Sequence, residues 1–510
     1  MDYDASLRWL LTLPDFERTG DFASRADVAP MLALLAELGD PHRGRPTVHI
    51  AGSKGKGSTG AMIEAVLGAA GLRTGYYISP HLHRYTERIR IDAKPIVHDA
   101  FAAAMTLIRA TIERVAPRFA DREFIAFDAL TAAAFIAFRD EDVDVQIIEV
   151  GLGGTLDSTN VFHEAGGGAQ ARTPAPHSAA SDDPTSNVQH PTSTAAATQR
   201  PKAMIVLTPI SLEHTAILGG TIGAIAAQKA GIITEGAAVI AAPQRESALD
   251  VFHAVADERG AAMIEVAKVC QMSRTSATLD EQQFKLKTSR ALYSATLPLI
   301  GRHQLDNAAT AIVACEEFAA QSGIELTPAH VAAGLAKVVW PARLEVLKRP
   351  SKAANPAATG GQPLVIIDGA HNGDSAKRMI TALREHASLS HAVFLFGTLA
   401  GKDVAAMADA IAPIADQVFV TSWPSARAAD PRALSDAFRA YDAPVTVIGN
   451  IEQAYEGAIE AAGARGAVVA FGSIAFVAAL REYLLGIESD MIRLALAPPN
   501  APSGGAPGAS

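Results

Sequence analysis

A glycine-rich turn between a short apolar run and an amphipathic stretch constrains the fold of this chain more than any other feature. The run is Thr47-Val-His-Ile-Ala51, and the turn that follows it is Gly52-Ser-Lys-Gly-Lys-Gly-Ser58. Glycines let backbone N–H groups close around phosphate oxygens, and the N-terminus of a following helix adds its positive dipole end. The order of these segments therefore predicts a strand, a phosphate-binding loop and a helix.

Two side chains of this loop have distinct expected roles. We expect Lys56 to hold the outer phosphates of a nucleotide and the Ser58 hydroxyl to reach Mg²⁺. Only Ser53 and Lys54 stand between Gly52 and the Gly-Lys pair, which is fewer residues than the common form of the motif has. The alternative interpretation of the segment is a flexible basic turn.

Short apolar runs alternate with helical patterns through the first 340 residues. The runs fall at 76–78, 143–150, 203–207 and 237–242, and the helical patterns fall at 59–70, 128–138 and 222–230. Such alternation is typical of a parallel sheet that is covered by helices on both faces. The sequence therefore predicts an α/β fold, with a mostly parallel nucleotide-binding domain of the P-loop type over 1–340.

A second series of apolar runs begins after Pro341. These runs are separated by alanine-rich segments and fall at 364–367, 393–396, 418–421, 445–448 and 468–471. The boundary is placed at Trp340-Pro341, because proline disfavours a helical conformation in the residue before it. The sequence thus predicts a smaller C-terminal α/β domain over 341–490.

Two segments lack the apolar residues that a folded core requires. In 164–200 the one large aliphatic side chain is that of Val188. Such a composition cannot bury enough apolar surface to offset the entropy lost on ordering. We expect a disordered insertion at 164–200, with a functional lid as the alternative, and a disordered tail at 491–510.

Charge and cysteine content argue against several classes of protein. The net charge of −10 disfavours nucleic acid or an anionic membrane as the main partner. With only Cys270 and Cys315, the chain has no disulfide framework or cysteine metal cluster, which suits a reducing cytoplasm. The N-terminus does not match a signal peptide, and the apolar run 467–480 is too short to span a bilayer. We expect a cytoplasmic protein with neither nucleic acid nor membrane as a partner.

Polar clusters follow several predicted strands, at the edge where ligands bind in open α/β sheets. Glu149 ends an apolar run and is placed to ligate a hard cation near Ser58, because a buried unpaired carboxylate is costly. The same argument applies to Asp368. The clusters are Ser79-Pro-His-Leu82, Glu149-Val-Gly-Leu-Gly-Gly154, Leu212-Glu-His-Thr215, Lys229-Ala-Gly231 and Asp368-Gly-Ala-His-Asn372.

Together with the loop, these clusters resemble the folate branch of the Mur-ligase superfamily, which includes folylpolyglutamate synthase and the bifunctional dihydrofolate synthase. Each motif alone is weak, but six of them in the family's order are specific. The resemblance runs from the first strand to the last apolar run, apart from the insertion and the tails. The longest matching segments are Ser79-Pro-His-Leu-His-Arg-Tyr-Thr-Glu-Arg88, Glu149-Val-Gly-Leu-Gly-Gly-Thr-Leu-Asp-Ser-Thr-Asn160 and Leu212-Glu-His-Thr-Ala-Ile-Leu-Gly219.

The resemblance implies an ATP-dependent ligase that acts as a monomer. In such an enzyme a substrate carboxylate takes the γ-phosphoryl group of ATP, and the amine of L-glutamate then displaces phosphate from the acyl phosphate. The implied acceptors are a folate, such as tetrahydrofolate, and dihydropteroate. Cations must cancel the repulsion between carboxylate and triphosphate, so Lys56 and Mg²⁺ are both expected at the site.

The family also implies roles for individual residues. The implied catalytic residues are Lys56, His214, Lys229 and His371, the last of which is expected near the phosphates or the glutamate amine. Lys229 matches a lysine that is carbamylated in the superfamily. The implied Mg²⁺ ligands are Ser58, Ser79, Glu149, His214 and carbamylated Lys229.

Matches to the family suggest further contacts on the nucleotide and on the substrate. The implied ATP contacts are Gly55, Lys56, Gly57, Ser58, Asn307, Arg343 and Asp368. The implied pterin or folate contacts are Phe127, Asp128, Thr155, Leu156 and Asp157. The chain departs from the family at Lys54, where asparagine is more usual, and at Thr155, where arginine is usual. The departure at Thr155 removes the arginine that the family would place at the dihydropteroate contact.

Simpler interpretations stay open for several residues. His81, His83 and His98 fit surface or packing positions as well as ligand positions. Glu87 and Arg88 could form only a solvated ion pair, and Lys229 could be a solvated lysine at a helix end. For the whole chain, the alternatives are a peptidoglycan-building Mur ligase and a regulatory P-loop NTPase.

Overall fold

The computed structural model describes residues 1–15, 27–119, 122–163, 203–347, 363–386, 391–441, 443–464 and 466–496. The insertion expected at 164–200 lies outside these ranges, as do residues 497–510 of the expected tail. The start of that tail is a correction, since Asp490–Leu496 form helix α18. The Asp490 side chain at the start of this helix accepts a hydrogen bond from the Tyr3 hydroxyl of the first domain. Amino-acid composition does not reveal such a contact, so the helix was not expected.

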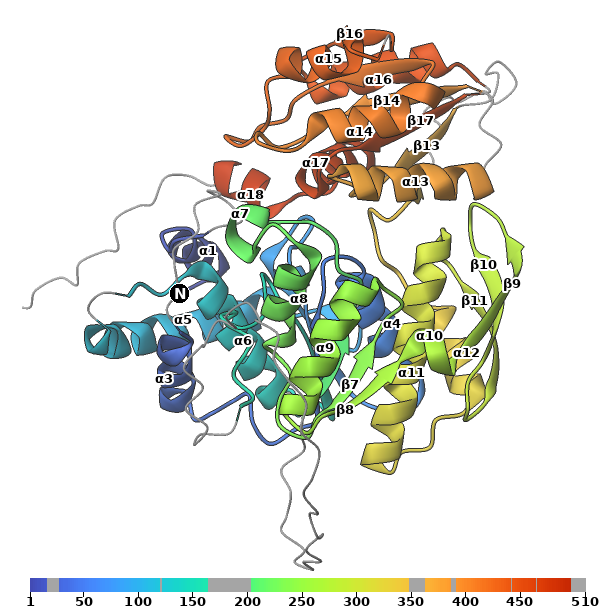
Figure 1. Ribbon diagram of the computed structural model, residues 1–510. Coiled ribbons are helices and arrows are strands. Elements are labelled where there is room, and N and C mark those ends of the chain that lie inside the picture. The colour runs from blue at the N-terminus through green and yellow to red at the C-terminus, as the bar shows by residue number, and fades with distance from the viewer. Residues whose placement is uncertain are drawn as a thin grey trace, which may run out of the picture.

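The first domain is built on an eight-stranded sheet with the order β4-β3-β2-β5-β1-β6-β7-β8 (Figure 1). The strands β2, β5, β1, β6, β7 and β8 run parallel to one another. Strands β3 and β4 are antiparallel additions at one edge. Their bounds are β1 Thr47–Ala51, β2 Thr74–Tyr77, β3 Ile89–Ile91, β4 Lys94–Pro95, β5 Val145–Glu149, β6 Met204–Leu207, β7 Ala238–Ala241 and β8 Ala262–Glu265.

Helices cover both faces of this sheet, as the alternating pattern predicted. Neighbouring residues of β5 belong to different cores, because successive side chains of a strand point to opposite faces. Ile147 packs with α4 (Lys56–Ala69), α11 (Arg302–Ser322) and α12 (Pro328–Leu335). Ile148 packs with the helices of the other face. Those helices are α1 Tyr3–Leu10, α3 Ala29–Glu37, α5 His98–Val115 and α6 Ala126–Asp140, with α8 Ile222–Ala230 and α9 Glu246–Glu258 beside β6 and β7.

A small antiparallel sheet that the sequence did not predict packs on the first face. It consists of β9 (Gln271–Ala277), β10 (Gln282–Lys287) and β11 (Leu292–Leu297). Phe284 and Leu286 of β10 are buried against α11 and α12, while Gln283, Lys285 and Lys287 are exposed. Side chains along β10 therefore alternate between a buried face and a solvent-exposed face of the sheet.

The second domain has a six-stranded sheet with the order β12-β13-β17-β14-β15-β16. All five predicted strands are present: β13 Leu364–Ile367, β14 Ala392–Phe396, β15 Gln417–Val420, β16 Val445–Val447 and β17 Ala467–Phe471. An antiparallel strand, β12 (Glu345–Leu347), pairs with β13 at the edge. One face carries α13 Gly373–His386, α14 Val404–Ile411 and α15 Pro431–Arg439, and the other carries α16 Ile451–Ala462 and α17 Ile474–Leu485.

The segment after β2 holds the two domains together. The His83 ring lies 3.0 Å from the Glu482 carboxylate and 3.0 Å from the Arg481 guanidinium, both on α17. Asp490 of α18 accepts hydrogen bonds of 2.7 Å from the Tyr3 hydroxyl and from the Tyr85 backbone N–H. These contacts fix the second domain above the carboxyl ends of the first domain's strands (Figure 1).

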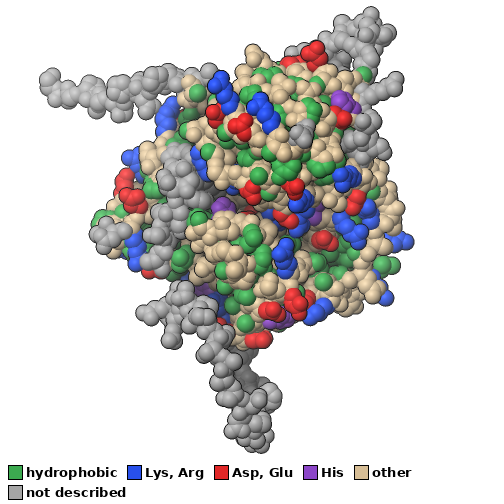
Figure 2. Space-filling view, turned by 45° about the horizontal axis from the view of Figure 1, so that its top comes forward, with side chains coloured by type: hydrophobic (Ala, Val, Ile, Leu, Met, Phe, Trp, Pro, Cys, Tyr) green, Lys and Arg blue, Asp and Glu red, His purple; other side chains and the backbone are tan. Residues whose placement is uncertain are grey.

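The surface is that of a mixed-charge protein. Lysine, arginine and acidic side chains are interspersed over the face drawn in Figure 2. Cys270 and Cys315 are both free thiols. None of the described helices combines the length and the hydrophobicity that a membrane-spanning segment needs.

Candidate active site

A cavity of about 1940 Å³ lies between the two domains and is lined by residues of both. Most of the residues predicted for the site line it, although they come from distant parts of the chain. They are Gly55, Lys56, Gly57, Ser58, Ser79, Phe127, Glu149, Leu156, Asp157, His214, Asn307, Arg343, Asp368 and His371. Asp128, Thr155 and Lys229 do not line it.

The glycine-rich turn leads from β1 into α4 and presents the helix N-terminus to the cavity. The backbone N–H groups of Ser53 and Lys54 both donate to the Pro209 carbonyl, at 3.0 and 3.1 Å, which fixes the course of the turn. Gly55 adopts a φ of +87° at the start of the helix, and a Cβ there would lie 2.4 Å from Oδ1 of Asn307. The helix start has no side-chain cap, so its N–H groups remain available to an anion.

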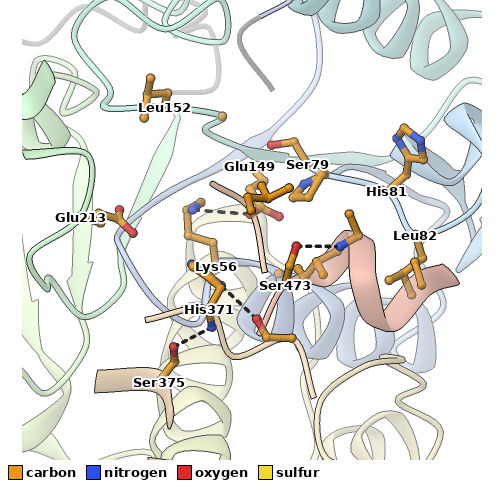
Figure 3. A pocket seen from close by; sticks show the side chains of 18 of the residues that line it. Lys56, Ser79, His81, Leu82, Glu149, Leu152, Glu213, His371, Ser375 and Ser473 are labelled. Carbon is orange, nitrogen blue, oxygen red and sulfur yellow. Dashed lines mark hydrogen bonds and ion pairs between the residues drawn. The ribbon is translucent and has the colours of Figure 1, made fainter. Parts of the chain in front are cut away.

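Lys56 and Glu149 face one another at the mouth of this loop (Figure 3). The Lys56 ammonium lies 3.7 Å from Oε1 of Glu149 and donates to the Gly52 carbonyl at 3.2 Å. Burial raises the pKa of Glu149 to about 7, although Lys56 and Arg343 favour the ionised form. The Tyr76 hydroxyl, 3.4 Å from Oε2, and the Ser79 backbone N–H are its further partners. This carboxylate is therefore incompletely compensated by the protein.

Lys229 is a buried residue on α8, so the interpretation as a solvated lysine at a helix end is wrong. Its side chain is 3% exposed, donates to the Gly52 carbonyl at 2.8 Å and pairs with the Glu213 carboxylate at 3.0 Å. Burial lowers the pKa of Lys229 to about 8, with Glu213 acting in the opposite direction. Lys229 thus connects α8 to the phosphate loop at Gly52. Its partner Glu213 lines the cavity, whereas Lys229 itself does not.

His214 lies next to Glu213 and also lines the cavity. Its φ of +47° places it in the left-handed region at the start of α7 (Thr215–Leu218). Burial lowers the pKa of this histidine, so the ring is neutral near pH 7. A neutral imidazole can bind a metal or accept a hydrogen bond.

The second domain contributes Arg343, Asp368 and His371 to the opposite wall. The Asp368 carboxylate accepts hydrogen bonds of 2.8 Å from the backbone N–H groups of Leu344 and Ala370, so it shapes the turn after β13. Burial lowers the pKa of His371 to about 3, and Lys54 acts in the same direction. Its Nδ1 lies 2.9 Å from the Gly369 carbonyl, which can only accept. The neutral ring therefore carries its proton on Nδ1 and leaves Nε2 as an acceptor.

Two of the expected substrate residues shape their loop rather than facing the cavity. Asp128 accepts from the Ser158 hydroxyl at 2.8 Å and from the Ile125 N–H at 3.0 Å, which caps α6. The Thr155 hydroxyl donates to the Gln228 carbonyl at 3.1 Å and so joins the loop to α8. Neither residue is part of the cavity wall, and these local hydrogen bonds hold their side chains; direct contact of Asp128 and Thr155 with a substrate stays a prediction.

The structure also corrects the interpretation of residues in the Ser79–Arg88 segment. Glu87 does not form a solvated ion pair with Arg88; it accepts from the backbone N–H groups of Leu82, His83 and Arg84 at 2.9 to 3.3 Å. Arg88 is buried and donates to Nδ1 of His81 at 2.9 Å. His98 stacks on Tyr3 at 3.8 Å, in agreement with a packing role.

Several cavity residues were not singled out by the sequence. They are Glu213, which was seen only as part of a motif, and the basic residues Lys402, Arg427 and Arg378 of the second domain. Lys402 lies in the loop between β14, which ends at Phe396, and α14, so its place after a strand was the available signal. Lys402, Arg427 and Arg378 bring basic side chains to the second-domain side of the cavity, which is also lined by Asp368, Glu452, Glu482 and Glu488.

A metal site is formed only in part by the protein itself. Within the described ranges, no group of three or more His, Cys, Asp or Glu side chains is arranged to hold a metal ion. The buried Ser58 hydroxyl and the undercompensated Glu149 carboxylate are nevertheless hard oxygen donors beside the phosphate loop. Mg²⁺ keeps several waters and uses one or two protein ligands together with phosphates, so this donor set fits it.

Close packing between the loop after β5 and α8 gives a testable requirement for glycine. A Cβ at Gly154 would lie 2.6 Å from the Gln228 carbonyl oxygen and 3.0 Å from Cα of Lys229. We expect Gly154→Ala to displace α8, to lower the free energy of unfolding by about 1–3 kcal/mol and to reduce kcat. Thermal melting and turnover of the purified variant measure both effects. Gly220→Ala is the matched control, because no atom lies within 4 Å of a Cβ at that position; equal behaviour of the two variants would contradict the prediction.

Comparisons with known proteins agree with this architecture. Residues 355–474 match the model of the Mur ligase, glutamate ligase domain. Folylpolyglutamate synthase of Lacticaseibacillus casei is 32% identical over 493 residues, which cover 96% of this chain and 100% of that protein. Dihydrofolate synthase/folylpolyglutamate synthase of Mycobacterium tuberculosis is 32% identical over 417 residues, covering 79% and 75%.

Solved structures extend the similarity to the fold. Folylpolyglutamate synthase of Mycobacterium tuberculosis, complexed with ADP and AMPPCP, superposes with a TM-score of 0.78 at 30% identity, covering 96% of this chain and 100% of that chain. A folylpolyglutamate synthase complexed with AMPPCP and folate gives 0.72 at 30% identity, covering 95% and 100%. The chain belongs to the folylpolyglutamate synthase and dihydrofolate synthase family of the Mur-ligase superfamily.

Proposed function

We propose that the protein is an ATP-dependent ligase that joins L-glutamate to a folate through an acyl phosphate. The observation that carries the proposal is the cavity whose walls combine the phosphate loop of one domain with the Arg343–His371 wall of the other, in a chain that matches folylpolyglutamate synthases along its length. A regulatory P-loop NTPase would leave the second domain and its half of the cavity without a role.

The nucleotide occupies the phosphate loop in this proposal. The N–H groups at the start of α4 and the Lys56 ammonium bind the phosphates, and relatives bind ADP and AMPPCP. Asn307, Arg343 and Asp368 are the proposed further contacts, since all three line the same cavity. Ser58 and Glu149 would hold Mg²⁺, with Ser79, His214 and carbamylated Lys229 as the remaining proposed ligands. The metal supplies positive charge at the transferred phosphoryl group.

The chemistry has two steps. A carboxylate oxygen of the folate attacks the γ-phosphorus, the bond to the bridging oxygen breaks, and ADP leaves. The glutamate amine then attacks the acyl carbon, phosphate leaves, and the amine loses a proton. Lys56 and the uncapped end of α4 stabilise the charge on the phosphoryl oxygens in the first step. His371 is a weak base, with a pKa of about 3, so its Nε2 orients a donor group rather than removing the proton.

Both carboxylate-bearing substrates have matching walls in the cavity. Phe127, Leu156 and Leu152 give an apolar surface near Asp157, which suits the aromatic pterin. Lys402 and Arg427 of the second domain lie on the other side, where glutamate carboxylates would meet them. Since one chain supplies both walls, we propose that a monomer is the active form and, with its free thiols, that it works in the cytoplasm.

The acceptor is tested by a side-by-side assay. We expect tetrahydrofolate to be glutamylated at a higher kcat/KM than dihydropteroate, because Thr155 is held away from the cavity and supplies no cation to the shorter substrate. Phosphate release and product mass are measured with each acceptor. Phosphate release should require both L-glutamate and the acceptor; release without either would support an NTPase, and a preference for dihydropteroate would reverse the proposed order.

A further inference from the structure

Lys54 is a second lysine of the phosphate loop, and its ammonium is buried without a hydrogen-bond partner among the described residues. The residue as a whole is half-buried and lines the cavity. Its backbone N–H donates to Pro209, so the turn fixes the direction in which the side chain leaves the loop. A buried ammonium that makes no hydrogen bond is costly, so its presence at this position points to a ligand.

The charges around Lys54 leave it only partly neutralised. Glu213 and Asp374 attract its ammonium, whereas Lys56 and Arg378 repel it. The Glu213 carboxylate also faces Lys56 and forms the 3.0 Å ion pair with Lys229, so it is shared among three lysines. Burial, together with this incomplete neutralisation, lowers the pKa of Lys54 to about 8. An incoming polyanion would supply the charge that the protein lacks.

Lys54 also reaches the second domain. Its charge acts on Asp368 and His371, which lie in the turn after β13, and on Asp374 at the start of α13. In the proposed nucleotide site the uncapped start of α4 binds phosphates, and Lys54 lies two residues before it. Since the charge of Lys54 acts on residues of the second domain, its ammonium lies on the side of the loop where the phosphoryl group would be transferred.

We propose that Lys54 donates a hydrogen bond to the terminal phosphoryl group of a bound nucleoside triphosphate, and so distinguishes the triphosphate from the diphosphate. The inference rests on the proposed use of ATP. It predicts that the two lysines of the loop hold the phosphoryl group from different sides, with Lys56 beside Glu149 and Lys54 beside the second domain. The contact is present before transfer and is lost when the terminal phosphate leaves.

The test compares the binding of AMPPCP with that of ADP, by calorimetry with Mg²⁺ and without folate or glutamate. Lys54→Met keeps most of the side-chain volume and removes the charge. We expect it to weaken AMPPCP binding about tenfold, which corresponds to ~1.4 kcal/mol, and ADP binding by less than about twofold. Lys54→Arg should retain most of the preference for AMPPCP. Lys377→Met is the matched control, because Lys377 is an exposed lysine of α13 outside the cavity.

Thermal melting without ligand separates this role from a structural one. Since the unpaired ammonium is removed, we expect Lys54→Met to melt at or above the temperature of the wild-type protein, with a smaller upward shift on adding AMPPCP. Equal weakening of ADP and AMPPCP, a lower melting temperature without ligand, or a loss confined to the KM for glutamate would each overturn the inference. If the wild-type protein discriminates AMPPCP through Lys54 but does not glutamylate folates, the proposed function alone fails.

Discussion

Lys229→Ala should reduce ligation by about 10²–10³-fold at neutral pH, because we expect the side chain to act as a carbamate that supports Mg²⁺. The neutral amine adds to CO₂ and releases one proton, which turns a cation into a carboxylate. Burial lowers the pKa of Lys229 to about 8, so roughly a tenth of the amine is neutral and able to react near pH 7, far more than for a solvated lysine. The 2.8 Å bond to the Gly52 carbonyl places this group directly behind the phosphate loop.

Chemical rescue identifies which form of Lys229 is active. Acetate or formate at high concentration should partly restore Lys229→Ala by filling the vacated anionic position, and Lys229→Arg should not respond. If the amine acts only by holding the Gly52 carbonyl, short alkylamines should restore activity and carboxylates should not. Lys268→Ala is the control, since Lys268 is exposed and pairs with Glu265 away from the cavity. Full activity of Lys229→Ala at saturating substrates would remove the carbamate from the mechanism.

Lys56→Ala should reduce ligation by about 10²–10³-fold while the protein stays folded. The Lys56 ammonium is 3.7 Å from Glu149 and contributes a point charge to a loop rather than packing to a core. Removing a charge that stabilises the transferred phosphoryl group costs about 10²–10³-fold in kcat. The loss also leaves Glu149 with less compensation, because Lys56 favours its ionised form.

Turnover at saturating ATP and thermal melting should be measured together for this variant. We expect a melting temperature close to that of the wild-type protein and a strong loss of kcat. Lys337→Ala provides the comparison, since that lysine is exposed after α12 and lies outside the cavity wall. Turnover like that of the wild-type protein, together with unchanged ATP affinity, would contradict the assignment of the phosphate loop.

The elements with a strong local signal could be predicted from the sequence. The bounds of α8 and β13 agree with the predicted 222–230 and 364–367, since apolar periodicity and flanking turns mark both. Helix α4 begins at Lys56 rather than at residue 59, because Gly55 takes the left-handed conformation that starts the helix. The sheet of β9, β10 and β11 was missed because its alternation is short and one face is wet.

Contacts within the site depended on tertiary structure. The motifs identified Lys229 and Glu213 as parts of separate clusters, but their ion pair forms only when α8 docks behind the loop. Asp128 was expected at the substrate because it matches a family position that contacts the pterin, and in the structure it caps α6 and binds Ser158. An acidic residue at the third position of a helix has a local use that the sequence alone cannot distinguish from a functional one.

The contact between α1 and α18 has a mechanical consequence. Tyr3 bonds to Asp490, and the Arg493 guanidinium lies 2.7 Å from the Asp4 carboxylate, so the second domain is fastened to the first by α18 as well as by the linker at 341–344. The contacts of His83 with Glu482 and Arg481 on α17 add a third attachment. Since these attachments lie far apart along the chain, the cavity can widen only if at least one of them is broken or strained.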